Sequence, residues 1–214
     1  MEKIYIVGAG GFAREVAWLI EDINEKNLTW EIVGFIDENE ENIGKELNGY
    51  LVLGDVEYLN KQEKANVVIA IGAGEVRENL SKKIKNHVYP ILIHPSVIKS
   101  KYMTIDEGTI VCAGTIMTTN INIGKHVIIN LDCTIGHDVI LENYTTILPS
   151  VNVSGNVMID ERTMVGTGTA IIQGLKIGTD SIIGAGSIVV KDIPNDCTAV
   201  GNPARPIKFK NKGI

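Results

Sequence analysis

Aliphatic residues recur at almost every sixth position between Ile93 and Val189, and this period is the strongest pattern in the chain. Sixteen of the seventeen positions in this register carry an apolar side chain, and Lys99 is the exception. A six-residue period is typical of a parallel β-helix, in which three hexapeptides form one triangular coil. We therefore predict stacked coils that share an aliphatic core.

A second inward layer accompanies the first, because the residue four places after each aliphatic position tends to be small or β-branched. The intervening corners carry many Gly, Asn and Asp residues, which accept the positive φ of a sharp turn. The period alone sets neither the handedness of the coils nor their chemistry. The predicted second layer consists of Thr109, Thr115, Val127, Cys133, Val139, Thr145, Val151, Val157, Thr163, Thr169, Ser181 and Ser187.

The first ninety residues follow a different pattern, in which apolar runs alternate with segments of helical spacing. This alternation predicts an α/β Rossmann-like domain over residues 1–90, followed by the β-helix over 91–214. Strands are expected at 3–7, 31–36 and 67–72, and helices at 14–23 and 75–84.

A glycine-rich turn joins the first predicted strand to the first predicted helix. Its pattern is G-x-G-x-x-A, with Gly8, Gly10, Gly11 and Phe12 at its centre. Glycines let a phosphate approach the backbone, and the free N–H groups at a helix start hold its charge. The pattern is weak by itself, and a tight turn that only packs helix on strand also fits it.

Asp37 and Glu38 end the second predicted strand, where an open α/β sheet often contacts a ribose, and Gly72 ends the third. We include all three in the candidate nucleotide site, although a solvated strand end also accounts for the two acids. Ninety residues make only half of a dinucleotide fold, and the remaining chain is β-helix. A nucleotide-linked substrate is therefore expected rather than a redox cofactor.

Composition and charge limit the classes of partner that we expect for this chain. The 214 residues carry a net charge of −6, with 44% hydrophobic and 21% charged residues. An acidic chain without a run of Lys and Arg does not predict a nucleic-acid partner. Three cysteines without a CxxC pair predict neither a metal site nor structural disulfides. This cysteine usage fits a reducing cytoplasm, and no apolar run is long enough to predict a membrane span.

His137 is the candidate catalytic residue. It follows Ile135 by two positions, so it projects outward at a corner, and Asp138 lies next to it. A carboxylate beside an imidazole favours its charged form and suits a general base. Gly155 lies three hexapeptides later, which is one full coil, so it stacks on His137, and its N–H suits an oxyanion donor. A surface histidine at a corner is the simpler alternative.

Over essentially its whole length the chain resembles the left-handed β-helix sugar acetyltransferases that carry an N-terminal nucleotide-sugar domain. It is most similar to the bacillosamine-pathway N-acetyltransferases and to sialic-acid O-acetyltransferase-like proteins. The resemblance is carried by Asn130 and by the segments 8–13 (GAGGFA), 35–38 (FIDE), 136–138 (GHD), 154–157 (SGNV) and 200–205 (VGNPAR).

The resemblance implies a homotrimer, with acetyl-CoA as co-substrate in the groove between neighbouring β-helices and no metal. It implies that His137 deprotonates the acceptor, that Asp138 supports its basicity, and that Gly155 N–H holds the thioester carbonyl. It assigns sugar orientation to Asn130. The acetyl-CoA site that it implies comprises Thr146, Gly155, Thr167, Ala185 and Pro203.

Phe12 and Thr146 depart from the family, because amine-specific relatives often carry histidine at these two positions. We therefore expect an acetyl-CoA-dependent N-acetyltransferase acting on a UDP-linked amino sugar, and keep two alternatives open. The first is sugar O-acetylation of the sialic-acid type, which the absent histidines leave possible. The second is an inactive trimeric scaffold that only binds a nucleotide sugar.

Overall fold

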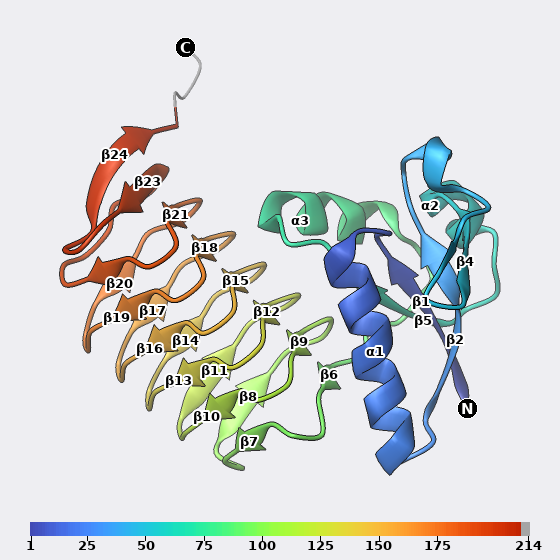
Figure 1. The fold of residues 1–214 in the computed structure, drawn as a ribbon, viewed down its shortest axis with the longest axis horizontal. Coiled ribbons are helices and arrows are strands. Elements are labelled where there is room, and N and C mark those ends of the chain that lie inside the picture. Colours follow the sequence, from blue (N-terminus) through green and yellow to red (C-terminus); the bar gives the residue numbers. More distant parts are fainter. Residues whose placement is uncertain (211–214) are drawn as a thin grey trace. The chain divides into compact units, whose positions relative to one another are not determined.

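The computed structural model describes residues 1–210 and divides into two compact units, Met1–Pro95 and a second unit from Ser96 onward (Figure 1). Short parallel strands dominate the second unit, and an α/β sheet forms the first. The fold class predicted from the sequence, a Rossmann-like unit followed by a left-handed parallel β-helix, is confirmed.

The first unit contains one sheet in the order β3-β4-β2-β1-β5. Strand β1 lies between β2 and β5 and is parallel to both. The chain thus leaves β1 toward one side and later returns to the other side, which creates a switch point at the carboxyl ends of the strands. The strands are β1 (Glu2–Val7), β2 (Trp30–Ile36), β3 (Glu46–Leu47), β4 (Tyr50–Gly54) and β5 (Asn66–Ile69), and β6 (Leu92–Ile93) ends the unit.

Three α-helices and one 3-10 turn connect these strands. Helix α1 buries an apolar stripe that includes Val16 and Ile20, as its helical spacing predicts. None of the helices within residues 1–210 has the length and apolar character needed to cross a membrane. The helices are α1 (Gly11–Lys26), η1 (Glu40–Asn42), α2 (Val56–Asn60) and α3 (Gly74–Lys83).

The sequence interpretation missed the hairpin formed by β3 and β4. Leu47 pairs with Tyr50, so Asn48 and Gly49 form a two-residue turn. Both turn residues have positive φ, 48° and 84°. An Asn-Gly pair is the preferred sequence for this tight hairpin turn, so a signal for the missed element was present.

The β-helix has three faces, each a parallel sheet whose strands pair with those one coil before and one coil after them. Face one contains β7 (Ile98–Lys99), β10 (Ile116–Met117), β13 (Thr134–Ile135), β16 (Asn152–Val153), β19 (Ala170–Ile171) and β22 (Ile188–Val189). Face two contains β8 (Met103–Ile105), β11 (Ile121–Ile123), β14 (Ile140–Leu141), β17 (Met158–Ile159) and β20 (Lys176–Ile177). Face three contains β9 (Ile110–Val111), β12 (Ile128–Ile129), β15 (Thr146–Ile147), β18 (Met164–Val165), β21 (Ile182–Ile183) and β23 (Cys197–Val200), to which β24 (Arg205–Phe209) adds in the antiparallel direction.

Both predicted inward layers are confirmed from Thr109 onward, whereas at the start of the first layer Ile93 and Ile105 are only partly buried and Lys99 is exposed. Every sixth residue from Val111 to Val189 is buried, and so are all twelve members of the second layer. The buried hydroxyls are satisfied internally: Thr115 Oγ1 donates to the carbonyl of Asn130 at 3.0 Å, and Thr163 Oγ1 to that of Gly178 at 2.8 Å. Small polar residues are therefore tolerated inside the coil because their hydroxyls reach backbone carbonyls, in these two cases carbonyls of a later rung.

The corners also repeat, because every sixth residue from Gly108 to Gly186 has a left-handed backbone. They form three columns, each named here by its content or place. The dyad corner, between faces one and two, contains Asn120, Asp138, Asn156 and Gly174 at its left-handed positions. The stacked corner, between faces two and three, contains Gly108, His126, Tyr144, Arg162 and Asp180. The third corner, between faces three and one, contains Gly114, Asp132, Ser150, Gly168 and Gly186.

Candidate active site

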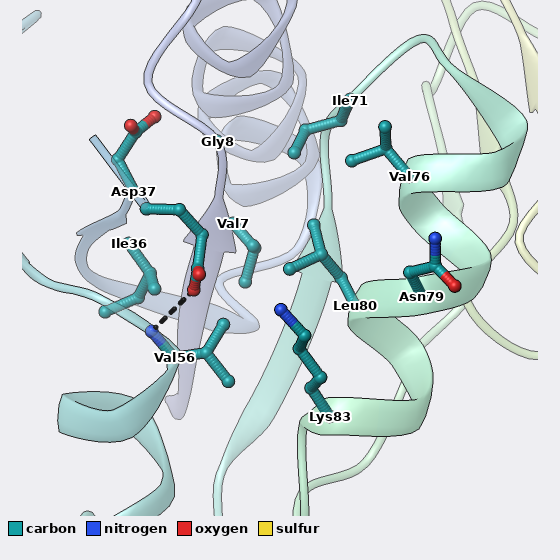
Figure 2. Close-up of a pocket in the computed structure, with 11 residues that line it drawn as sticks. Val7, Gly8, Ile36, Asp37, Val56, Ile71, Val76, Asn79, Leu80 and Lys83 are labelled. Carbon is teal, nitrogen blue, oxygen red and sulfur yellow. Dashed lines mark hydrogen bonds between the residues drawn. The ribbon is translucent and has the colours of Figure 1, made fainter.

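A pocket of about 340 Å³ lies at the switch point of the first unit (Figure 2). The carboxyl ends of β1 and β2, the start of α2 and one side of α3 enclose it. This is the place where open α/β sheets bind ligands, and the volume falls in the range of small-molecule sites. Its lining is mostly apolar and consists of Val7, Gly8, Ile36, Asp37, Glu38, Val56, Ile71, Val76, Asn79, Leu80 and Lys83.

The glycine-rich turn is tightly packed at Gly8 and open at Gly10. Gly8 has φ +111°, and a Cβ there would lie 3.0 Å from the Ala70 carbonyl oxygen, so close packing requires glycine. A Cβ on Gly10 would meet nothing within 4 Å. Gly10 is also the N-cap of α1, which receives no side-chain cap. The start of α1 is therefore open to an anion that the helix dipole and backbone N–H groups attract.

The two acids at the end of β2 have different surroundings. Asp37 Oδ1 accepts hydrogen bonds from the backbone N–H of Asn39 at 2.9 Å and from Asn42 Nδ2 at 3.3 Å. Glu38 Oε1 accepts from Val56 N–H at 3.2 Å, which is the dashed contact in Figure 2. Glu38 thus joins β2 to the start of α2, and Asp37 is held by its own loop while lining the pocket.

The pocket brings together three of the predicted substrate residues, Gly8, Asp37 and Glu38. Gly10, Gly11, Phe12 and Gly72 are not among its lining residues, and Phe12 lies half-buried in the first turn of α1.

The sequence interpretation missed two pocket residues on α3. Asn79 and Lys83 are exposed and lie one helical turn apart, with their side chains at the pocket in Figure 2. Their spacing of four is the signal that could have found them, because it places both on one face of the helix that follows β5.

The predicted dyad forms in the second unit. His137 Nδ1 lies 2.7 Å from Asp138 Oδ2, and both side chains are about half exposed, at 51% and 50%. The hydrogen bond from His137 and a second from Asn120 hold the pKa of the Asp138 carboxyl below its usual value. The carboxylate therefore stays charged and accepts a hydrogen bond from the Nδ1–H group, which leaves Nε2 as the basic atom.

Gly155 lies directly against the imidazole. A Cβ added to Gly155 would fall 2.8 Å from His137 Cδ2 and still closer to Nε2, so any larger residue displaces the ring. Gly136 is equally constrained, because a Cβ there would lie 2.6 Å from the nitrogen of Gly155. The Gly-His-Asp segment and Gly155 thus fit each other across one coil, as the spacing of three hexapeptides predicts.

Asn120 was also missed from the sequence. It lies one coil before Asp138, and its Nδ2 donates to Asp138 Oδ1 at 3.2 Å. The signal was the coil spacing, applied toward the N-terminus instead of only toward Gly155.

Apart from Gly155, the predicted acetyl-CoA residues lie elsewhere on the chain. Thr146 is buried on β15 of face three, while Thr167 and Ala185 are exposed at the third corner. Pro203 lies in the turn between β23 and β24. Asn130 is also at the third corner, 7% exposed, with Oδ1 accepting from Leu131 N–H at 2.7 Å. Within one chain these residues do not share the corner of His137.

The other histidines have structural contacts. His87 bonds Leu59 O at 3.1 Å and the N–H of Ala65 at 3.3 Å, His94 bonds Asp22 at 2.7 Å, and His126 stacks on Tyr144. Burial raises the pKa of the Cys133 thiol to about 11, so it is a core residue rather than a nucleophile. Within residues 1–210, no three His, Cys, Asp or Glu side chains gather to hold a metal ion.

Comparison with known proteins identifies relatives of the whole chain. Residues 3–84 match the PglD N-terminal domain. The GDP-perosamine N-acetyltransferase of Escherichia coli O157:H7 is 32% identical over 95% of this chain and 95% of its own length.

Solved structures extend this similarity to the coordinates. PerB from Caulobacter crescentus, solved with CoA and GDP-perosamine, is 30% identical, covers 97% of this chain and 98% of its own, and has a TM-score of 0.86. The acetyltransferase domain of PglB from Neisseria gonorrhoeae, solved with acetyl coenzyme A, is 29% identical, covers 96% and 99%, and has a TM-score of 0.88.

Proposed function

This chain belongs to the hexapeptide-repeat, acetyl-CoA-dependent sugar acetyltransferases, and from that membership we propose that it acetylates the amino group of a nucleotide-linked amino sugar. The observation that carries the proposal is the His137–Asp138 pair, joined at 2.7 Å and packed against Gly155. This arrangement supplies a base with its orienting carboxylate, next to a backbone N–H on the following coil.

The mechanism follows from these groups. The neutral acceptor amine attacks the thioester carbonyl, and His137 Nε2 takes the proton that the nitrogen loses. Asp138 accepts the Nδ1 hydrogen bond, which fixes the tautomer and stabilises the imidazolium. Gly155 N–H donates to the oxygen that becomes negative in the tetrahedral intermediate. The carbon–sulfur bond then breaks, the thiolate is protonated, and the products are an N-acetyl sugar and CoA.

The nucleotide is proposed to bind in the first unit. Its base and ribose fit the mostly apolar pocket beside Asp37 and Glu38, and its phosphates suit the open start of α1 at Gly10. The sequence interpretation favours UDP, whereas one relative is named for GDP-perosamine and PerB was solved with GDP-perosamine bound. We therefore leave the base to experiment and propose the amino-sugar acceptor in either form.

The assay is release of free thiol from acetyl-CoA with matched UDP- and GDP-linked amino sugars and their hydroxy counterparts. We expect release with one amino sugar and a loss of about 100-fold or more in His137→Ala, the usual contribution of a general base. Asn156→Gly, at the same corner, is the control and should retain activity. Near wild-type turnover of His137→Ala would refute the mechanism, and release only with hydroxy sugars would indicate O-acetylation.

We also propose that the enzyme works as a homotrimer. His137 lies at the dyad corner, whereas Asn130, Thr167 and Ala185 lie at the third corner of the same chain. A site that uses both corners therefore requires two copies, with CoA in the groove between them.

Light scattering on the eluting protein gives the subunit number, and subunit mixing tests the shared site. His137→Ala and Ala185→Trp, each inactive alone, should regain activity when unfolded, mixed and refolded together. No recovery in mixed trimers would place both residues in a site within one chain.

A further inference from the structure

The oxygens of the Asp138 carboxylate have separate partners. Oδ2 lies 2.7 Å from His137 Nδ1, and Oδ1 accepts from Asn120 Nδ2 at 3.2 Å. From this geometry, and resting on the proposed function, we propose that Asn120 is a positioning residue. It holds the Asp138 carboxylate in the orientation that presents Oδ2 to the imidazole.

Such a residue is needed because the dyad is half exposed. The Asp138 side chain is 50% accessible, so packing alone does not select one rotamer for it. Hydrogen bonds from His137 and, to a smaller extent, from Asn120 lower the pKa of its carboxyl. The Asn120 amide thus occupies Oδ1 of the carboxylate and leaves Oδ2 to bind His137.

Asn120 is itself held in place. Its backbone N–H donates to the Tyr102 carbonyl at 2.6 Å, and Thr119 Oγ1 donates to its Oδ1 at 3.4 Å. The second bond orients the amide, because an oxygen that accepts from Thr119 turns the NH₂ group toward Asp138. A connected set of hydrogen bonds therefore links Thr119 to Asn120, Asn120 to Asp138, and Asp138 to His137.

The left-handed backbone of the corner explains why an asparagine is present at position 120, but it does not explain the hydrogen bond from Asn120 to Asp138. Asn120 has φ 56° and Asn156, in the same column, has φ 57°, and asparagine tolerates this conformation. Among the described residues, Asn156 makes no hydrogen bond to Asp138 comparable with that of Asn120. The two positions share a backbone requirement and differ in their relation to the dyad, so they form a matched pair.

The experiment compares Asn120→Gly with Asn156→Gly. Glycine satisfies the left-handed corner, so neither variant should lower the melting temperature. In Asn120→Gly we expect kcat to fall about tenfold, a part of the general-base contribution, with KM for acetyl-CoA unchanged. Asn120→Asp keeps the shape but cannot donate, so it should lose at least as much activity. Asn156→Gly should match wild type.

The second readout needs no substrate. Nitrogen-15 chemical shifts of His137 report the fraction of imidazole with its proton on Nδ1, and this fraction should fall in Asn120→Gly and not in Asn156→Gly. This measurement separates the two proposals, since it stands even if the wild-type protein fails to acetylate any sugar tested. Wild-type kcat and an unchanged tautomer in Asn120→Gly would overturn the role of Asn120.

Discussion

The dyad corner and the stacked corner use the same backbone for different purposes. Both place a left-handed residue once in every coil. At the stacked corner, side chains of successive coils contact each other. His126 stacks on Tyr144, with ring centroids 5.4 Å apart, and Arg162 binds Asp180 through two hydrogen bonds of 2.9 Å. At the dyad corner, His137 and Asp138 remain half exposed.

The difference shows that one corner backbone can present either side chains that stabilise the fold or side chains that remain exposed for chemistry. The two inward layers hold the coil together, so the outward residues of one column can stabilise while those of another perform chemistry. The contrast can be tested by disturbing each corner and measuring both activity and stability.

The largest effect is expected at the dyad corner from Gly155→Ala. The added methyl displaces the His137 ring, which is exposed enough to swing aside, so the base is lost while the coil remains intact. Activity should fall about 100-fold, as for removal of a general base, with little change in melting temperature. Thiol release and scanning calorimetry on one preparation would check this. A large fall in melting temperature would show that the dyad corner is structural after all.

The corresponding change at the stacked corner is Arg162→Met, which keeps the packing of the stem but removes both bonds to Asp180. Their side chains are 21% and 23% exposed, so we expect a loss of about 1–2 kcal/mol in the free energy of unfolding, reduced by solvent screening. Denaturant titration measures the loss, and kcat should be unchanged. Reduced kcat at unchanged stability would contradict the separation of the two corners.

The pH dependence of the stacked corner provides a third test. Hydrogen bonds from Arg162 lower the pKa of the Asp180 carboxyl. Because the folded-state pKa is depressed, the stabilisation is present above the unfolded value of about 4 and is lost as the pH falls through the folded value. The stability difference between wild type and Asp180→Asn should therefore be full at pH 7 and be lost in acid, as the pH falls through the lowered pKa of the folded-state carboxyl. A difference that persists in acid would rule out the ion pair as its cause.

The smallest effect is expected at the third corner, where Ser150 has φ 59°. Ser150→Gly removes the strain of a left-handed backbone and should raise stability by about 0.5–1 kcal/mol, or a few degrees in melting temperature. Gly168, the next member of the same column, already has this conformation at φ 69°. If calorimetry shows no rise in melting temperature, the serine side chain stabilises the fold by as much as its left-handed backbone destabilises it.

The sequence predicted the β-helix well because its core repeats. Every inward position is set by a period of six, so one register identifies Val111 and Val189 alike. The same spacing located Gly155 against His137. The first unit was less predictable, since β3 and β4 are short and their register depends on a two-residue turn.

The missed residues share a physical reason. Asn120, Asn79 and Lys83 are recognised by where their side chains point, which follows from helical and coil spacing and not from the hydrophobic period or the glycine content used for the rest. Asparagine is also common at left-handed corners because it tolerates positive φ. Its presence at position 120 therefore gives no sign of the contact with Asp138.

The triangular coil also limits how this protein can change in length. Inserting one hexapeptide between His137 and Gly155 would carry Gly155 round to another corner, and inserting three would move it one coil further away. Between these two residues the chain can therefore gain or lose no hexapeptide. Beyond them, whole coils can be added or removed without separating base from glycine, so we expect relatives of this enzyme to differ in their number of coils outside that interval and not within it.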